Sequence, residues 1–426
     1  MGMEKLPSVV IGAGPVGLAA AAHLYENNQS FTIIEKGERS GNNILGWGHV
    51  QLFSPWKYNI NQAAKRLLKQ TEWVEPEGDK LPTGKELVDE YLEPLASLRP
   101  IKENSLYGAE VIAITKKNMD KMKSQSREET PFVLYIKVNG KVEKITAKSV
   151  IDTSGTWSNP NSPYADGLWR TDKTRIHTHI PDTNQEVEIF KNKHVAIIGS
   201  GHSAQNTLID LSKLKEEYPE TRITWILRKK YVQEAFGGEE LDELAARGQL
   251  GSKAHQLVNN GMVNVYTNYF VEDIEEIDGT FIITSSDGTK IDEVDEIIAN
   301  TGSRPDFSFL SEIRLDIDPI VESTRALAPL IDPNLHSCGT VRPHGEKELR
   351  QPEPGFYIAG VKSYGRAPTF LMATGYEQVR SIVSYLSGDY EASEKVELIL
   401  PETGVCSTNL STKQLKIIGV NSSSCC

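Results

Sequence analysis

A short apolar run near the start of the chain leads into Gly12-Ala-Gly-Pro-Val-Gly17, and alanines follow directly. Glycines at this spacing, after a strand and before a helix, are typical of a dinucleotide-binding turn. Gly12 allows the tight turn, Gly14 lets backbone N–H groups approach a pyrophosphate, and Gly17 lets the helix lie close to the strand. The pattern therefore predicts a strand, a turn and a helix that bind a dinucleotide.

An acidic residue ends the next apolar run, which covers residues 31–34. Glu35 follows Gly12 at roughly the 20-residue spacing expected for a carboxylate that accepts hydrogen bonds from a ribose hydroxyl. An ordinary glycine turn is the alternative, but the strand, the helix and the acid all fit the dinucleotide interpretation. Glu35 does not separate FAD from NAD, because both cofactors carry an adenosine ribose.

The same motif returns in the second half of the chain as Gly199-Ser-Gly-His-Ser-Ala204. Its third glycine has become Ala204, which the dinucleotide fingerprint permits. The partner strand ends in Arg228-Lys229-Lys230, where the first unit has its acid. Arginine binds a phosphate through paired hydrogen bonds, and no carboxylate repels it here. We therefore expect NADPH rather than NADH at this turn; a solvated basic strand end is the alternative.

With both motifs in place, the chain resembles the flavoproteins that have two dinucleotide-binding domains, and among them the flavin-containing monooxygenases. The resemblance covers about residues 7–390 and also rests on two small-residue turns, which end at Gly155 and Gly302. It implies an α/β fold with two Rossmann-like domains, the NADPH domain being inserted in the FAD domain. The expected limits are 1–165 and 326–395 for the two parts of the FAD-binding domain, 166–325 for the NADPH-binding domain, and 396–426 for a C-terminal tail.

The resemblance also implies which residues bind each cofactor. Those expected at FAD are Gly12, Gly14, Pro15, Gly17, Glu35, Trp47, Gly155, Gly360 and Thr369. Those expected at NADPH are Gly199, Gly201, Ser203, Ala204, Arg228 and Lys229. Two features depart from the family pattern: Val361 follows Gly360 where many relatives have Asp, and residues 175–181 offer only the histidines of the monooxygenase signature.

Aromatic side chains are dense in residues 47–56, just past the strand that ends in Glu35. A flat isoalloxazine ring needs apolar planar neighbours about here, and a packed loop with two buried tryptophans is the alternative. Pro368 is placed to begin a late helix, whose N-terminal dipole would stabilise negative charge on a reduced flavin. His49, Gln51 and Asn59 are candidate catalytic residues by position alone.

The resemblance implies a flavoprotein monooxygenase. NADPH would reduce the flavin, and the reduced flavin and O2 would form a C4a-(hydro)peroxyflavin that oxygenates a small soft nucleophile or a carbonyl. Because the cofactor carries this chemistry, few catalytic side chains are needed. We therefore expect a small-molecule substrate and O2 as partners, and no metal. A non-enzymatic sensor of NADPH or FAD is an alternative from another class.

The cysteines bear on a second alternative, an NADPH-dependent reductase. Disulfide reductases on this scaffold commonly need a C-x-x-C pair beside the flavin, and the second turn has no cysteine. The chain nevertheless ends in Cys425 and Cys426, with Cys406 upstream, which resembles the thiol tails of mercuric-reductase-type flavoproteins. Thiolates are soft ligands and would suit a thiophilic substrate such as an arsenical or a disulfide. A disordered, serine-rich tail with incidental cysteines is the alternative.

Charge and composition exclude other partners. A net charge of −12 argues against a nucleic-acid surface or an anionic membrane. No apolar stretch approaches the roughly 20 residues that a membrane-spanning helix needs. Four cysteines in 426 residues do not make a disulfide framework, so we expect a reducing, cytoplasmic location. The sequence leaves the substrate and the oligomeric state open.

Overall fold

The computed structural model describes residues 3–242, 244–335, 344–368 and 370–398, which form two compact units. Unit 1 contains the described residues of Met1–Pro160, Ser303–His336 and Val341–Leu400. Unit 2 contains those of Asn161–Gly302, so the chain leaves unit 1 once and then returns to it.

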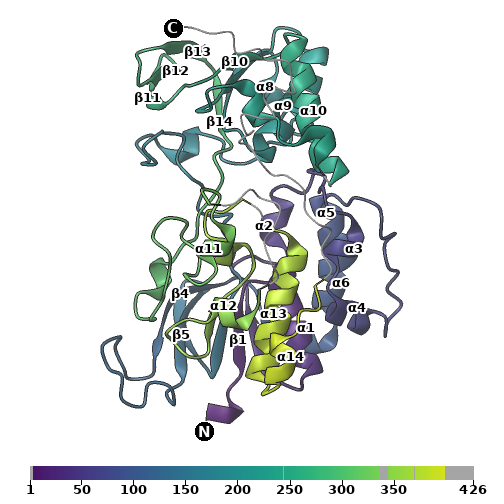
Figure 1. The fold of residues 1–426 in the computed structure, drawn as a ribbon, viewed down its shortest axis with the longest axis vertical. Coiled ribbons are helices and arrows are strands. Elements are labelled where there is room, and N and C mark those ends of the chain that lie inside the picture. The colour runs from purple at the N-terminus through teal and green to yellow at the C-terminus, as the bar shows by residue number, and fades with distance from the viewer. Residues whose placement is uncertain (1–2, 243, 336–343, 369, 399–426) are drawn as a thin grey trace. The chain divides into compact units, whose positions relative to one another are not determined.

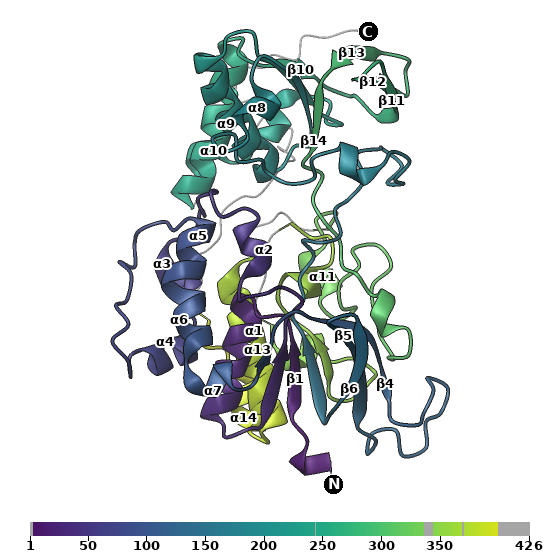
Figure 2. The same ribbon diagram turned by 180° about the vertical axis from the view of Figure 1, so that it is seen from behind.

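The centre of unit 1 is a parallel sheet with the strand order β15-β7-β1-β2-β3. Its strand β1 is labelled in Figures 1 and 2. Its strands are β1 (Ser8–Ile11), β2 (Phe31–Ile34), β3 (Ser105–Leu106), β7 (Ser149–Asp152) and β15 (Phe356–Ile358). Ile11 pairs with Ile34 on one side and with Asp152 on the other, so three strands end side by side. In sheets of this kind, ligands bind outside the carboxyl ends of the strands.

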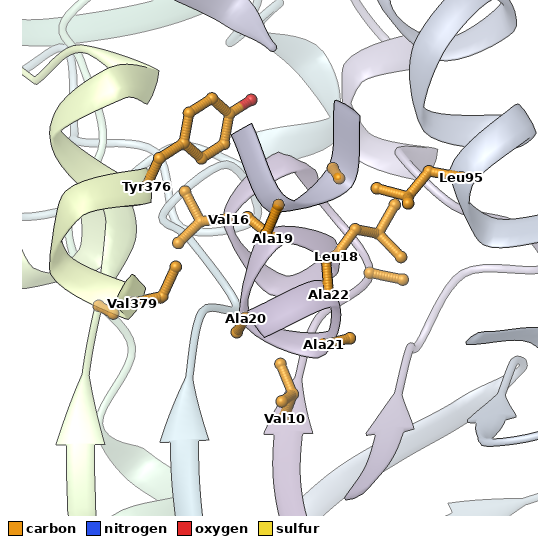
Figure 3. Packing of buried hydrophobic residues seen from close by; sticks show 14 of the residues in the cluster. Val10, Val16, Leu18, Ala19, Ala20, Ala21, Ala22, Leu95, Tyr376 and Val379 are labelled. Carbon is orange, nitrogen blue, oxygen red and sulfur yellow. The ribbon is translucent and has the colours of Figure 1, made fainter. Parts of the chain in front are cut away.

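Helices cover one face of this sheet. Val10 of β1 and Ala19–Ala22 of α1 are fully buried, and α1 packs beside α13 (Figure 3). Small side chains allow this close packing. The α-helices of unit 1 are α1 (Pro15–Glu26), α2 (Asn42–Leu45), α3 (Trp56–Asn59), α4 (Gln62–Leu68), α5 (Gly84–Glu86), α6 (Glu93–Ser97), α7 (Arg99–Lys102), α11 (Ala328–Ile331), α12 (Glu346–Leu349), α13 (Met372–Leu386) and α14 (Tyr390–Glu394). Its other helices are the 3₁₀ helices η1 (Met3–Lys5), η6 (Ser308–Leu310) and η7 (Gly360–Tyr364) and the π-helix η2 (Leu87–Leu92).

An antiparallel sheet of three strands covers the other face. Its strands are β4 (Ala109–Lys116), β5 (Phe132–Val138) and β6 (Lys141–Ala147). Val9 and Ile11 belong to the core on this side, whereas Val10 between them belongs to the helical side. Successive strand residues point to opposite faces, so Val9, Val10 and Ile11 are all apolar although they face two different cores.

Unit 2 repeats the plan with a parallel sheet of strand order β10-β9-β8-β14 (Figure 1). The parallel strands are β8 (His194–Ile198), β9 (Arg222–Ile226), β10 (Asn264–Tyr266) and β14 (Glu296–Ala299). The antiparallel strands on one face are β11 (Val271–Ile277), β12 (Thr280–Ser285) and β13 (Lys290–Val294). The helices are α8 (Val187–Phe190), α9 (His202–Glu217), α10 (Ala245–Asn259), η3 (Lys173–Arg175), η4 (Val232–Ala235) and η5 (Glu239–Leu241). The predicted α/β fold with two Rossmann-like sheets is therefore confirmed.

None of the helices in the described part of the chain combines the length and the apolar character needed to cross a bilayer. The longest helix of unit 2, α9, exposes Lys213, Glu216 and Glu217 in its second half. The helices therefore pack against sheets within each unit, as the two hydrophobic clusters that contain α1 and α9 show.

A buried histidine at the end of α1 makes the stability of unit 1 depend on pH. Burial lowers the pKa of His23 from 6.5 to about 4, and its Nε2 lies 3.2 Å from Nδ2 of Asn61. The unfolded chain binds a proton at His23 more tightly than the folded chain does. The stability that neutral, buried His23 contributes is therefore present above pH 6.5 and is lost as the pH falls toward 4. From pH 7 to pH 5, His23→Gln should lose about 2 kcal/mol less unfolding free energy than the wild type. Urea unfolding at both pH values measures this; equal losses would contradict it.

Candidate dinucleotide-binding sites

The first glycine turn is built so that nothing larger than glycine fits at two positions. Gly12 has a φ of +99°, in the left-handed region. A Cβ on Gly17 would lie 2.0 Å from the carbonyl oxygen of Gly12, so α1 packs directly on the turn. A Cβ on Gly14 would meet no atom within 4 Å, and Pro15 is the first residue of α1. The N-terminus of α1 therefore faces open space, as a bound pyrophosphate requires.

Glu35 connects the turn to the end of β2. Its Oε2 accepts a hydrogen bond from the N–H of Ala13 and its Oε1 accepts one from the N–H of Gly37, both at 2.7 Å. These bonds hold the carboxylate beside the turn. Each carboxylate oxygen has a second lone pair, so both can also accept from ribose hydroxyls.

A cavity of about 350 Å³ lies at the carboxyl ends of β1, β2 and β7 in unit 1. This volume is at the lower end of the range for small-molecule sites. Gly12, Glu35 and Gly155, which were predicted from sequence, line it. Residues that the sequence analysis missed also line it: Lys36, Asn42, Asn43, Glu110, Val111, Ser154, Thr156, Ser158, Asn159, Asp306 and Phe309. Asp306 and Phe309 come from the segment that returns to unit 1, and no local motif marks them.

Gly360 lies at the end of β15, where α1 and α13 meet. Its φ is +72°, and a Cβ here would lie 3.4 Å from the Val16 side chain. Its N–H donates to Oε1 of Gln378 at 2.8 Å. The helix expected to begin at Pro368 begins instead at Met372, as α13. Its N-cap, Leu371, has an extended backbone conformation.

A buried ion pair that the sequence analysis missed joins β7 to η7. Nζ of Lys362 lies 2.7 Å from Oδ2 of Asp152 and 3.1 Å from Oγ of Ser154. Both charged side chains are 0 % exposed, and the ammonium lies 4.5 Å from the ring centroid of Phe309. Ser154 and Phe309 line the cavity, so this pair supports one of its walls.

The remaining residues predicted for unit 1 lie elsewhere. Trp47 is half-buried against the helical core, and His49 is also half-buried. Gln51 is exposed and donates to the carbonyl of Leu81. Asn59 is buried, and both polar atoms of its side chain bond to Ser54, which accounts for it without a ligand. These four do not line the 350 Å³ cavity. Their roles in binding and catalysis stay predictions.

Four other predicted site residues, Thr369, Cys406, Cys425 and Cys426, lie outside the described residues.

The second turn repeats the geometry of the first. Gly199 has a φ of +138°, and a Cβ on it would lie 2.2 Å from the carbonyl oxygen of Asn300. A Cβ on Gly201, the N-cap of α9, would meet no atom within 4 Å. Ser203 is exposed in the first turn of α9, and Ala204 is fully buried. The N-terminus of α9 thus also faces open space.

The strand end beside the second turn differs from the sequence expectation by one residue. The N–H of Gly199 donates to the carbonyl of Ile226, as that of Gly12 donates to Ile34. The residue equivalent to Glu35 is therefore the buried Leu227, and Arg228 is equivalent to Lys36. Leu227 gives the turn no negative charge.

The two basic residues that follow differ in their surroundings. The Arg228 side chain is exposed and makes no hydrogen bond or ion pair with any other described residue. Lys229 is half-buried, and burial lowers the pKa of its ammonium. Arg228 is therefore the more accessible of the two for a 2′-phosphate.

Two parallel sheets, each with a glycine turn before a helix at its carboxyl edge, define a two-domain dinucleotide-binding protein. Residues 9–338 match the family described as Pyridine nucleotide-disulphide oxidoreductase, and the chain belongs to this family. A sequence search of curated proteins found no match.

Solved structures with the same fold include reductases and monooxygenases. The bacillithiol disulfide reductase of Bacillus cereus has a TM-score of 0.66 at 19% identity, over 90% of this chain and 99% of that one. The FAD-bound cadaverine monooxygenase of Erwinia amylovora has a TM-score of 0.62 at 13% identity, over 95% of this chain and 98% of that one. The ornithine N-hydroxylase of Kutzneria sp. 744, with reduced FAD, NADP+ and L-ornithine, has a TM-score of 0.58 at 14% identity, over 91% of this chain and 98% of that one.

The chain is therefore a flavoprotein oxidoreductase of this family, and its resemblance to two-domain flavoproteins is confirmed. The family and the fold agree with the prediction of FAD and NADPH as cofactors. The solved structures that share the fold include both reductases and monooxygenases.

Proposed function

We propose that the protein is an FAD-dependent NADPH monooxygenase that oxygenates a small soft nucleophile or a carbonyl compound. One observation carries the choice of oxygen over disulfide chemistry: no cysteine precedes residue 338, so both glycine turns and the cavity lie in thiol-free sequence. Disulfide exchange needs a thiolate as the nucleophile. The two monooxygenases of the same fold support the proposal.

The residues around the first turn fit FAD. The open space at Gly14, before α1, suits a pyrophosphate, and Glu35 is held where a ribose would lie. The cavity extends from Glu35 to Gly155, along the ends of three strands. Bound FAD would supply hydride acceptance and reaction with O2, so the chain's own residues bind, orient and shield.

The residues around the second turn fit NADPH. The N-terminus of α9 is open to a pyrophosphate, and Arg228 forms no ion pair with an acidic residue in the described part of the chain. The absence of a carboxylate at Leu227 removes the partner that a 2′-hydroxyl would use in NADH. NADPH is therefore the proposed reductant.

Consumption of NADPH in air, measured over a panel of sulfides, amines and ketones with peroxide release recorded alongside, tests the proposal. We expect one panel member to raise the rate, to suppress peroxide and to gain one ¹⁸O atom from ¹⁸O2. Oxidation of NADPH without oxygen, coupled to reduction of a disulfide, would contradict it. So would a flavin that NADPH leaves oxidised without oxygen, the result expected of a sensor.

The C-terminal thiols suggest a competing proposal, a reductase for a thiophilic substrate. The disulfide reductase of the same fold supports this alternative. If Cys425 and Cys426 deliver such a substrate, changing both to serine will lower turnover with an arsenical or a disulfide. NADPH oxidation without substrate would stay the same. We expect oxygenation by the double variant to equal that of the wild type, and unchanged turnover with the thiophile would reject delivery by these two thiols.

A further inference from the structure

A buried tryptophan of unit 2 donates a hydrogen bond to the backbone of the second glycine turn. Trp225 of β9 is 0 % exposed, and its indole Nε1–H donates to the carbonyl oxygen of Gly199 at 2.7 Å. Its ring also packs beside Phe236, with the ring centroids 6.3 Å apart. An indole has only one N–H to donate, and here it is given to the first glycine of the turn.

The direction of this carbonyl determines the direction of the next N–H. A trans peptide is planar, so its C=O and its N–H point in opposite directions. Because Trp225 fixes the Gly199 carbonyl, it also fixes the N–H of Ser200. No described residue accepts a hydrogen bond from this N–H, so it is available to a ligand.

The first turn fixes the same peptide from its other end. There the N–H of Ala13, the equivalent of Ser200, donates to Glu35. The residue that matches Trp225 on the strand is Ile33, which has no donor. One turn thus uses an acid on the N–H side, and the other uses an indole on the C=O side. The second arrangement fixes the peptide without placing a negative charge beside it.

We propose that Trp225 is a positioning residue for the dinucleotide at the second turn. It orients the Gly199–Ser200 peptide for the pyrophosphate and replaces the acid that would repel a 2′-phosphate. This rests on the proposed function, namely that a nicotinamide dinucleotide binds here. The pyrophosphate is common to NADPH and NADH, so loss of the indole N–H must weaken both equally, whereas Arg228 acts on NADPH alone.

The test replaces Trp225 by 3-benzothienylalanine, in which sulfur takes the place of the indole N–H while the ring shape is kept. Titration calorimetry of the FAD-loaded protein gives the dissociation constants of NADP+ and NAD+. We expect both to rise by the same factor, about fivefold, as for loss of one neutral hydrogen bond. FAD content should not change. Trp225→Phe, which also removes the donor, should show the same equal rise.

A matched control is Trp73, whose Nε1–H also donates to a backbone carbonyl at 2.7 Å, that of Glu90 in unit 1. The same replacement there should leave both dissociation constants unchanged. Unchanged constants in the Trp225 analogue, or a rise for NADP+ alone, would overturn the role of Trp225. If the wild type bound neither dinucleotide, the proposed function itself would fail.

Discussion

Lys362→Met is expected to destabilise the protein by about 3–5 kcal/mol, because it leaves the Asp152 carboxylate buried without its partner. Both side chains of this pair are 0 % exposed, and the two charged atoms are 2.7 Å apart. The destabilisation is a large part of the total for an ordinary domain, about 5–15 kcal/mol. Urea unfolding, monitored by the release of flavin, measures this loss of stability in unit 1.

Two controls separate this effect from loss of a lysine in general. Lys57 of the same unit also pairs at 2.7 Å, with Asp79, but both side chains are half or more exposed. Lys57→Met should leave the unfolding midpoint unchanged. Combining Lys362→Met with Asp152→Asn removes the buried charge and should restore part of the loss. A Lys362→Met variant as stable as Lys57→Met would show that the pair does not support the cavity wall.

Arg228→Ala is expected to lower kcat/KM for NADPH by about 10- to 100-fold, the range for loss of charge-assisted hydrogen bonds. The value for NADH should stay the same, since NADH has no 2′-phosphate. Steady-state kinetics with both cofactors measures the ratio.

Arg222 provides the matched control, because it is exposed at the opposite end of the same strand. Arg222→Ala should leave the NADPH/NADH ratio unchanged. An equal loss with both cofactors in Arg228→Ala would place Arg228 away from the 2′-phosphate.

The fold could be predicted because its signals are local. Each glycine turn lies within six residues, next to an apolar run and a helix. The hairpin of β5 and β6 was also predictable, because an Asn-Gly pair favours the two positive φ angles of a tight hairpin turn. Asn139 and Gly140 have these angles, at 49° and 76°. Such patterns need no knowledge of distant segments.

The site was less predictable because its walls come from distant parts of the chain. Asp306 and Phe309 reach the cavity only after the chain has completed unit 2. The partner of Lys362 lies 210 residues away in sequence. The equivalence of Leu227 to Glu35 is visible only from backbone hydrogen bonds, because the loops before the two strands differ in length. Pairing over such distances leaves no periodic signal.

The central claim is that one chain carries FAD at the turn of Gly12 and accepts electrons for it from NADPH. The most direct measurement is the visible spectrum of the purified protein, before and after NADPH is added without oxygen. We expect an oxidised flavin spectrum, FAD on extraction, and bleaching of the visible flavin absorption that NADPH drives far faster than NADH. A colourless protein that FAD does not reconstitute, or a bound flavin that NADPH leaves oxidised, would contradict the account.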